Sequence, residues 1–333
     1  GTEDLGGGLK ASFLFENDFD TRFDAQGPLG VSPTAKGVNI GSGGGEQFLA
    51  IEGGMGKLQI GAANTPSLTT QASRQPFSTK IGGGFKGDGV GVLGQGHVRS
   101  NNSVVYTSPA MSGFTVAAAY GFKHNAGPTG ATEGALATTI GTAGSTVSTN
   151  LTNQAAISDI GVFYANGPLS AGVSAWNTAE VISVAGVKTP TINQINSFVS
   201  YDLGVARLIA GYHTEKQDAH QNATNILSGA NYTGYNVAGV VPLSANLSLL
   251  ANYGSLTDKL AGRTATPLNK TIAAVGLRYN LSKMTSVYAR YIDEKNENIA
   301  AAFAAGGRLS TTTSLANAAT AVKTTLVGMQ TNF

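Results

Sequence analysis

The feature that most constrains the fold of this chain is a hydrophobic alternation with a period of two residues. In the segment 114–122, one face carries Phe, Val, Ala, Tyr and Phe in turn, whereas the other carries Thr, Ala and Gly. Segments 246–253 and 274–281 repeat this pattern. Such alternation predicts β-strands that have one apolar face and one small or polar face.

The breaks between these segments come in two sizes that alternate along the chain. Short breaks of two to five residues have the composition of tight turns and occur at 52–56, 109–113, 166–168, 202–204, 242–245 and 282–284. Long breaks rich in Gly, Ser, Thr, Asn and Ala occupy about 20–44, 68–97, 124–154, 182–190, 219–229, 260–269 and 300–322. Short turns at one rim and long loops at the other are typical of transmembrane barrels, whereas a soluble sandwich or propeller is not expected to separate them.

About fourteen alternating segments are expected to be strands, at 9–19, 46–53, 57–66, 98–108, 114–123, 155–165, 169–180, 191–201, 205–217, 230–241, 246–258, 270–281, 285–298 and 323–333. Most are 9–13 residues long, which suits tilted strands that cross a bilayer. Seven tyrosines near segment ends share the apolar face and predict an interfacial aromatic girdle: Tyr106, Tyr120, Tyr164, Tyr201, Tyr253, Tyr279 and Tyr291. The sequence lacks the apolar run of about 18 residues that a membrane-spanning helix needs. We therefore predict an all-β, transmembrane antiparallel β-barrel made of one domain, residues 1–333.

Composition excludes several classes of function. Charged residues are 12% of the chain, cysteine is absent and the net charge is +2. Disulfides, thiolate metal sites and a basic surface for nucleic acid are therefore not expected. The four histidines lack metal-ligand spacing, and Gly89–Gly94 matches a dinucleotide-binding pattern without the helix that such a site requires. Since no catalytic constellation is visible either, we predict no enzyme, metal site or cofactor.

Three motifs and the last residue carry a family resemblance. Residues 1–11 (GTEDLGGGLKA) and 102–109 (NSVVYTSP, followed by Gly113-Phe114) are joined by 279–288 (YNLSKMTSVY) and the terminal Phe333. The chain resembles the Gram-negative general porins of the neisserial and burkholderial type over its whole length. The three motifs are similar to that family's first periplasmic turn and following strand, its strand after the third loop, and its penultimate hairpin.

The resemblance implies an integral protein of the Gram-negative outer membrane, a sixteen-stranded barrel and a homotrimer surrounded by lipid and lipopolysaccharide. It also implies that the last strand, 323–333 with Phe333, is an assembly signal for the barrel-assembly machinery. In the family two strands precede the turn that opens this chain. We therefore expect roughly 35–40 residues of the mature protein before Gly1.

Charged residues on the polar face are expected to line the lumen, because a charge facing lipid near the bilayer centre costs about 2–4 kcal/mol. The predicted pore wall comprises Glu16, Glu46, Lys123, Asp159, Arg207, Arg278 and Arg290. The resemblance identifies 68–97 as the third loop, which in such porins folds inward and narrows the channel. The predicted constriction comprises Arg74, Lys80, Lys86 and Asp88 of this loop and Arg99 on the wall, with Pro76-Phe77 as a packing anchor.

These residues predict a passive diffusion channel for small hydrophilic solutes and ions. The basic excess in the loop predicts mild repulsion of cations. Anion-selective members of the family carry arginines where this chain has Glu46, so we predict weak charge selectivity. Two alternatives are a substrate-specific channel for sugars, organic acids or phosphate, and a structural or adhesive barrel with a closed lumen. A specific channel often has an aromatic track, and only Phe198, Tyr288 and Trp176 share the lumen parity.

Overall fold

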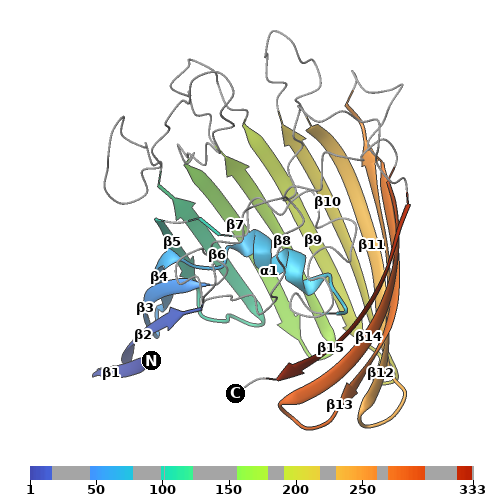
Figure 1. Cartoon of the computed structure of the whole chain (residues 1–333). Coiled ribbons are helices and arrows are strands. Elements are labelled where there is room, and N and C mark those ends of the chain that lie inside the picture. The colour runs from blue at the N-terminus through green and yellow to red at the C-terminus, as the bar shows by residue number, and fades with distance from the viewer. Residues whose placement is uncertain are drawn as a thin grey trace, which may run out of the picture.

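The computed structural model describes residues 1–16, 46–77, 99–100, 102–122, 156–178, 191–217, 230–260, 269–296 and 321–331. Within them, fifteen strands form one sheet in which each strand pairs with the next along the chain, from β1 to β15. Figure 1 shows that this sheet curves around helix α1. The all-β architecture expected from the alternation is confirmed.

The strands are β1 (Thr2–Gly6), β2 (Leu9–Phe15), β3 (Gln47–Gly53), β4 (Gly56–Ala62), β5 (Ser103–Thr107), β6 (Phe114–Gly121), β7 (Ile157–Asn166), β8 (Leu169–Thr178), β9 (Ile192–Asp202), β10 (Arg207–Gln217), β11 (Ala230–Pro242), β12 (Leu247–Asp258), β13 (Lys270–Asn280), β14 (Thr285–Asn296) and β15 (Ala321–Thr331). Helix α1 (Pro66–Ser73) lies in the connection between β4 and β5.

The short connections gather at one end of the sheet, which we call the short-turn rim. They join β1 to β2, β3 to β4, and each following odd-numbered strand to the next, up to β13 and β14. Every described pairing is antiparallel, for example over the full length of β9 and β10. Consequently β1 and β15, the two edges of the described sheet, point in the same direction. Closure with sixteen strands stays a prediction.

The period of two separates an apolar outer face from a more polar inner face. In β6, Phe114, Ala118 and Tyr120 are exposed outward, whereas Ala117 and Ala119 are buried inward. The polar side chains Asn196 and Asn236 are fully buried within the curve of the sheet. Six of the seven predicted girdle tyrosines are 39–48% exposed on the outer face: Tyr106, Tyr120, Tyr201, Tyr253, Tyr279 and Tyr291. Tyr164 is half-buried because its ring packs against that of Phe114, at 4.7 Å between centroids.

Two expectations about local structure need correction. Residues Thr2–Gly6 form strand β1 instead of a turn, because the turn falls at Gly7 and Gly8, whose φ angles of 61° and 82° suit glycine. The strand expected at 57–66 ends at Ala62, and the segment after it continues as α1. Among the described residues, no helix is long and apolar enough to cross a membrane.

The outer face gives a stability prediction that depends on depth. Val275 lies at the middle of β13 and is 45% exposed outward, whereas Leu281 lies next to the short-turn rim and is 58% exposed. We expect Val275→Lys to lower the free energy of unfolding in lipid vesicles by about 2–4 kcal/mol, and Leu281→Lys by at most about 1 kcal/mol. Denaturant titration in vesicles measures both. Equal losses at the two positions would contradict an outer face in contact with lipid.

Candidate functional site: the inner wall and the segment it holds

The segment 65–77, which we call the inner segment, begins with a capped helix. Thr65 is the N-cap of α1, in extended conformation, and its hydroxyl oxygen accepts a hydrogen bond from the backbone N–H of Leu68 at 3.3 Å. Pro66 follows at the first helical position, where its missing N–H costs nothing and its fixed φ suits the helix. The Thr-Pro pair therefore supplies a local start signal for the helix.

The sheet then attaches the start of this helix to β7. The carboxylate of Asp159 accepts hydrogen bonds from the backbone N–H of Ser67 at 2.7 Å and from its hydroxyl at 2.8 Å. A carboxylate at a helix N-terminus also faces the positive end of the helix dipole, a contribution of typically about 0.3–1 kcal/mol. Asp159 is 3% exposed, so this first attachment lies in the interior of the curved sheet.

A second attachment follows the helix, where Arg74 reaches the inner face of β10 and β11. Its guanidinium donates to the backbone oxygen of Tyr212 at 3.4 Å, and its own backbone oxygen accepts from the Asn236 side chain at 3.0 Å. The side chain fits because residue 211 is glycine: a Cβ there would overlap the side chains of Arg74 and Asn236.

A third attachment joins Phe77 to the far wall. Phe77 is 3% exposed and packs in an apolar cluster with Leu250, Ile272, Ala274 and Ile292 on β12 to β14. The Arg290 guanidinium stacks over the Phe77 ring, with 4.0 Å from its central carbon to the ring centroid. Gly276 leaves room for the ring, since a Cβ there would lie 2.7 Å from it. The packing anchor expected at Phe77 is present.

All three attachments have a glycine in the wall that makes room for the inner segment. Glycine stands in the wall at each point where the inner segment comes closest: Gly161 opposite Pro66, where a Cβ would lie at 2.7 Å, Gly211 opposite Arg74, and Gly276 opposite Phe77. The inner segment therefore runs along the inner face from β7 to β13 and β14. It is held by a carboxylate at one end and by an aromatic ring at the other.

Glu46 and Arg99 meet at Asn64, just before the inner segment. The Glu46 carboxylate accepts from the backbone N–H and the side-chain amide of Asn64, both at 2.9 Å. The Asn64 side-chain oxygen in turn accepts from Arg99 Nε at 2.7 Å. Glu16 joins this group through its carboxylate, which accepts from the backbone N–H of Glu46 at 2.9 Å. Glu46 and Arg99, whose charges are expected to favour ions of opposite sign, are therefore both hydrogen-bonded to Asn64.

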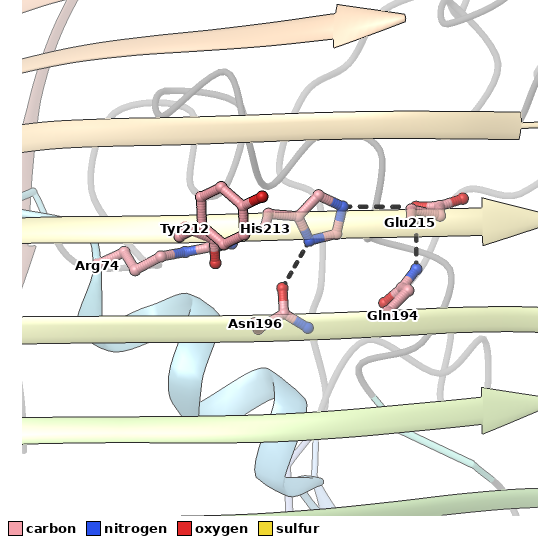
Figure 2. Close-up of polar contacts among 6 residues, drawn as sticks. All are labelled: Arg74, Gln194, Asn196, Tyr212, His213 and Glu215. Carbon is pink, nitrogen blue, oxygen red and sulfur yellow. Dashed lines mark hydrogen bonds and ion pairs between the residues drawn. The ribbon is translucent and has the colours of Figure 1, made fainter. Parts of the chain in front are cut away.

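A second polar group lies on β9 and β10 beside Arg74, as Figure 2 shows. His213 is fully buried; its Nδ1 lies 2.8 Å from the Asn196 side-chain oxygen, and its Nε2 lies 3.7 Å from the Glu215 carboxylate. Gln194 donates to the same Glu215 oxygen at 3.0 Å. These contacts hold the Glu215 side chain in place on the inner face.

The structure places most of the predicted wall residues on the inner face. Glu16, Glu46 and Asp159 lie on the side of β2 to β7, whereas Arg207, Arg278 and Arg290 lie on the side of β10 to β14. Each arginine is an even number of residues from a buried inward-facing residue, namely Ile209, Ala274 and Ile292, and so shares its face. Arg74 belongs to the inner segment, and Arg99 lies beside the acidic group. Lys80, Lys86, Asp88, Lys123 and Phe333 lie outside the described residues.

Several inner-face residues were not predicted from the sequence, although they share the parity of the predicted wall residues. Lys270 and Glu294 form an ion pair of 2.6 Å between β13 and β14, and Glu215 follows the parity of Arg207. Phe163 shares the inner parity of Asp159 and leans over Gly172, as Phe198 does from the other side. The alternation alone would have found all of these. Trp176, in contrast, is 2% exposed and donates to Thr178, so its ring is not open to solutes.

The residues described contain no cluster of three or more His, Cys, Asp or Glu side chains that could hold a metal ion.

Comparison with known proteins identifies several relatives. A sequence profile described as Gram-negative porin matches residues 1–299. The outer membrane porin protein 32 of Delftia acidovorans is 27% identical over 304 residues, covering 90% of this chain and 73% of the relative.

Solved structures show the same fold. The anion-selective porin from Comamonas acidovorans superposes with a TM-score of 0.64 at 22% identity, covering 89% of this chain and 77% of that one. The trimer form of OmpT, an outer membrane protein of Vibrio cholerae, has a TM-score of 0.60 at 15% identity, covering 99% and 88% of the two chains.

We call the three wall glycines, Gly161, Gly211 and Gly276, the glycine sockets, and one of them gives a prediction with a matched control. Gly211→Ala places a methyl group against the side chains of Arg74 and Asn236, whereas a Cβ at Gly239 on the neighbouring strand meets nothing closer than 3.9 Å. We expect Gly211→Ala to lower the free energy of unfolding by about 1–3 kcal/mol through overpacking. Gly239→Ala is expected to leave it unchanged. Denaturant titration of both variants in detergent or lipid measures the difference, and similar stabilities would show that Gly211 is not a socket.

Proposed function

Because this chain belongs to the Gram-negative porin family, we propose that it is a passive diffusion channel whose lumen is narrowed by the inner segment and only weakly selective for charge. Its relatives are named outer membrane porins, and the chain is an integral outer-membrane protein and a porin channel. The porin relatives are channels and not enzymes.

The observation that carries the proposed constriction is the path of the inner segment. Its contacts with Asp159, Tyr212 and Phe77's apolar cluster keep it inside the curve of the sheet, where solutes would pass. Thr69 on α1 is exposed although its neighbours Leu68 and Thr70 are buried, so it faces the open part of the interior. We infer that α1 forms one side of the narrowest passage.

The arrangement of charges supports weak selectivity. Among the predicted wall residues, Glu46 lies next to β3 and Arg278 lies on β13, in distant parts of the curved sheet, and both are partly exposed. Asp159 and Arg290 are each 3% exposed and are covered by the inner segment. Opposite charges across a confined passage create a transverse field without a large excess of one sign. A related structure is an anion-selective porin. In this chain Glu46 stands where the resemblance expects an arginine in anion-selective members of the family, and we therefore propose a smaller preference for anions.

We also propose a homotrimer in contact with lipid and lipopolysaccharide, assembled through recognition of the last strand. One structural relative is known in a trimer form. The outer face of β2 and β3 carries large exposed apolar side chains, including Phe13, Phe15 and Leu49 at 57–68% exposure. A face of this kind suits either lipid or a second subunit.

Planar-bilayer recording tests the proposed channel. We expect discrete conductance steps that increase in proportion to salt concentration, and a reversal potential close to zero in a KCl gradient, because the lumen charges nearly balance. Saturation of flux by one class of sugar, organic acid or phosphate would instead identify a substrate-specific channel. Absence of any single-channel current would favour the structural barrel.

The chain contains no cysteine, so one introduced cysteine is a unique probe of the constriction. We expect a charged thiol reagent to lower the conductance of Thr69→Cys, because the added group occupies the passage beside α1. The control is Val205→Cys in the β9–β10 turn, where residue 205 is 75% exposed at the short-turn rim. Modification there should leave the conductance unchanged, and an equal effect at both positions would rule out α1 as the narrow point.

A further inference from the structure

A cavity of about 620 Å³ opens on the inner face of β2 to β5, between the short-turn rim and α1. Its charged lining residues are Lys10, Glu46, Glu52 and Lys57, and Thr69 of α1 lines it as well. The volume lies within the range of roughly 300–1,000 Å³ that is usual for small-molecule sites. Because α1 packs on β6 to β9, a solute that passes α1 meets this cavity on the adjoining part of the wall.

Three of the charges form one row across the strands, which we call the charged row: Lys10, Glu52 and Lys57. Lys10 pairs directly with Glu52, and Glu52 pairs directly with Lys57. Residues directly opposite in an antiparallel sheet point to the same face, with Cβ atoms about 4.5–5.5 Å apart. The row therefore alternates positive, negative and positive, and its two lysines are attached about 10 Å apart, two strand spacings. At its β1 end Lys10 also pairs with Asp4, whose carboxylate accepts a hydrogen bond from the Gly6 N–H at 2.8 Å.

The charged row differs from Glu46 in how its members are held. Glu46 is fixed by two hydrogen bonds from Asn64. In the part of the chain that the structure describes, the side chains of Lys10 and Glu52 take part in no hydrogen bond or ion pair. The Lys57 ammonium lies 4.6 Å from the centroid of the Phe48 ring, a contact that leaves its N–H donors available. Charges of both signs are thus free to meet a ligand.

We propose that the charged row is a binding site for small zwitterionic solutes, amino acids or short peptides, as they cross the channel. The solute ammonium pairs with Glu52 and its carboxylate with Lys10 or Lys57. A solute that carries one sign of charge alone meets an attracting and a repelling neighbour together, whereas a zwitterion satisfies both. The hydroxyls of Thr69 and Thr107, which line the same cavity, suit a hydrophilic solute. Ion pairs this exposed are weak, which favours release and so permits transport.

This inference rests on the proposed channel, and one recording tests both separately. Single channels are recorded in KCl with glycylglycine added, and then with N-acetylglycinamide, an uncharged solute of similar size. We expect glycylglycine to lower the conductance along a saturating curve, and the uncharged solute to give only a small, linear decrease. Absence of KCl current would overturn the channel itself. A normal KCl current with equal effects of the two solutes would overturn only the zwitterion site.

Variants connect the effect to the charged row. Glu52→Gln and Lys10→Gln should each raise the half-saturating glycylglycine concentration about two- to five-fold, the size expected for one exposed ion pair. The matched control is Lys283→Gln, which removes an exposed lysine from the β13–β14 turn on the same rim. Its saturation curve should equal that of the unsubstituted protein. The KCl conductance of each variant shows that it has folded, and an unchanged curve for Glu52→Gln would refute the assignment.

Discussion

The whole structure depends on one constraint: a chain that crosses lipid as strands must pair its backbone N–H and C=O groups with neighbouring strands. The continuous ladder from β1 to β15 provides these pairs without interruption between adjacent strands. Once the backbone is fixed in this way, side chains alternate strictly between two environments. The outer face can be apolar because it needs no polar partner. The inner face can carry Asn196, Asn236 and Asp159 because each of these side chains makes at least one hydrogen bond with another polar group there.

The inner segment shows how a polar interior is filled without losing specificity. A purely hydrophobic contact would hold it only at Phe77, where apolar side chains converge. Elsewhere the attachments are hydrogen bonds between a backbone group of the inner segment and a side chain of the wall: the Ser67 N–H donates to Asp159, and the Asn236 side chain donates to the backbone oxygen of Arg74. Such bonds depend on direction as well as distance. They therefore fix the position of the helix along the wall, which burial alone does not do.

Much of this could be predicted from the sequence, for a physical reason. Lipid on one side and water on the other impose a period of two that is visible in any strand, so the alternation alone assigns Glu16, Arg207 and Arg278 to the polar face. Contacts between distant segments leave no such periodic trace. Nothing local to Asp159 indicates that it caps a helix 92 residues earlier in the chain, and Gly211 and Gly276 read as ordinary small residues. Thr65-Pro66 was a recognisable helix start that the expectation of a strand over 57–66 concealed.

The three glycine sockets have a mechanical meaning as well. A curved sheet is stiff along its strands but bends easily across them, so a cylinder of strands resists stretching better than flattening. The inner segment touches the wall at β7, at β10 and at β13 and β14, and it acts as an internal rib across this compliant direction. Lateral pressure that flattens the wall must also shift Arg74 and Phe77 in their sockets. The width of the passage therefore depends on the cross-sectional shape of the barrel.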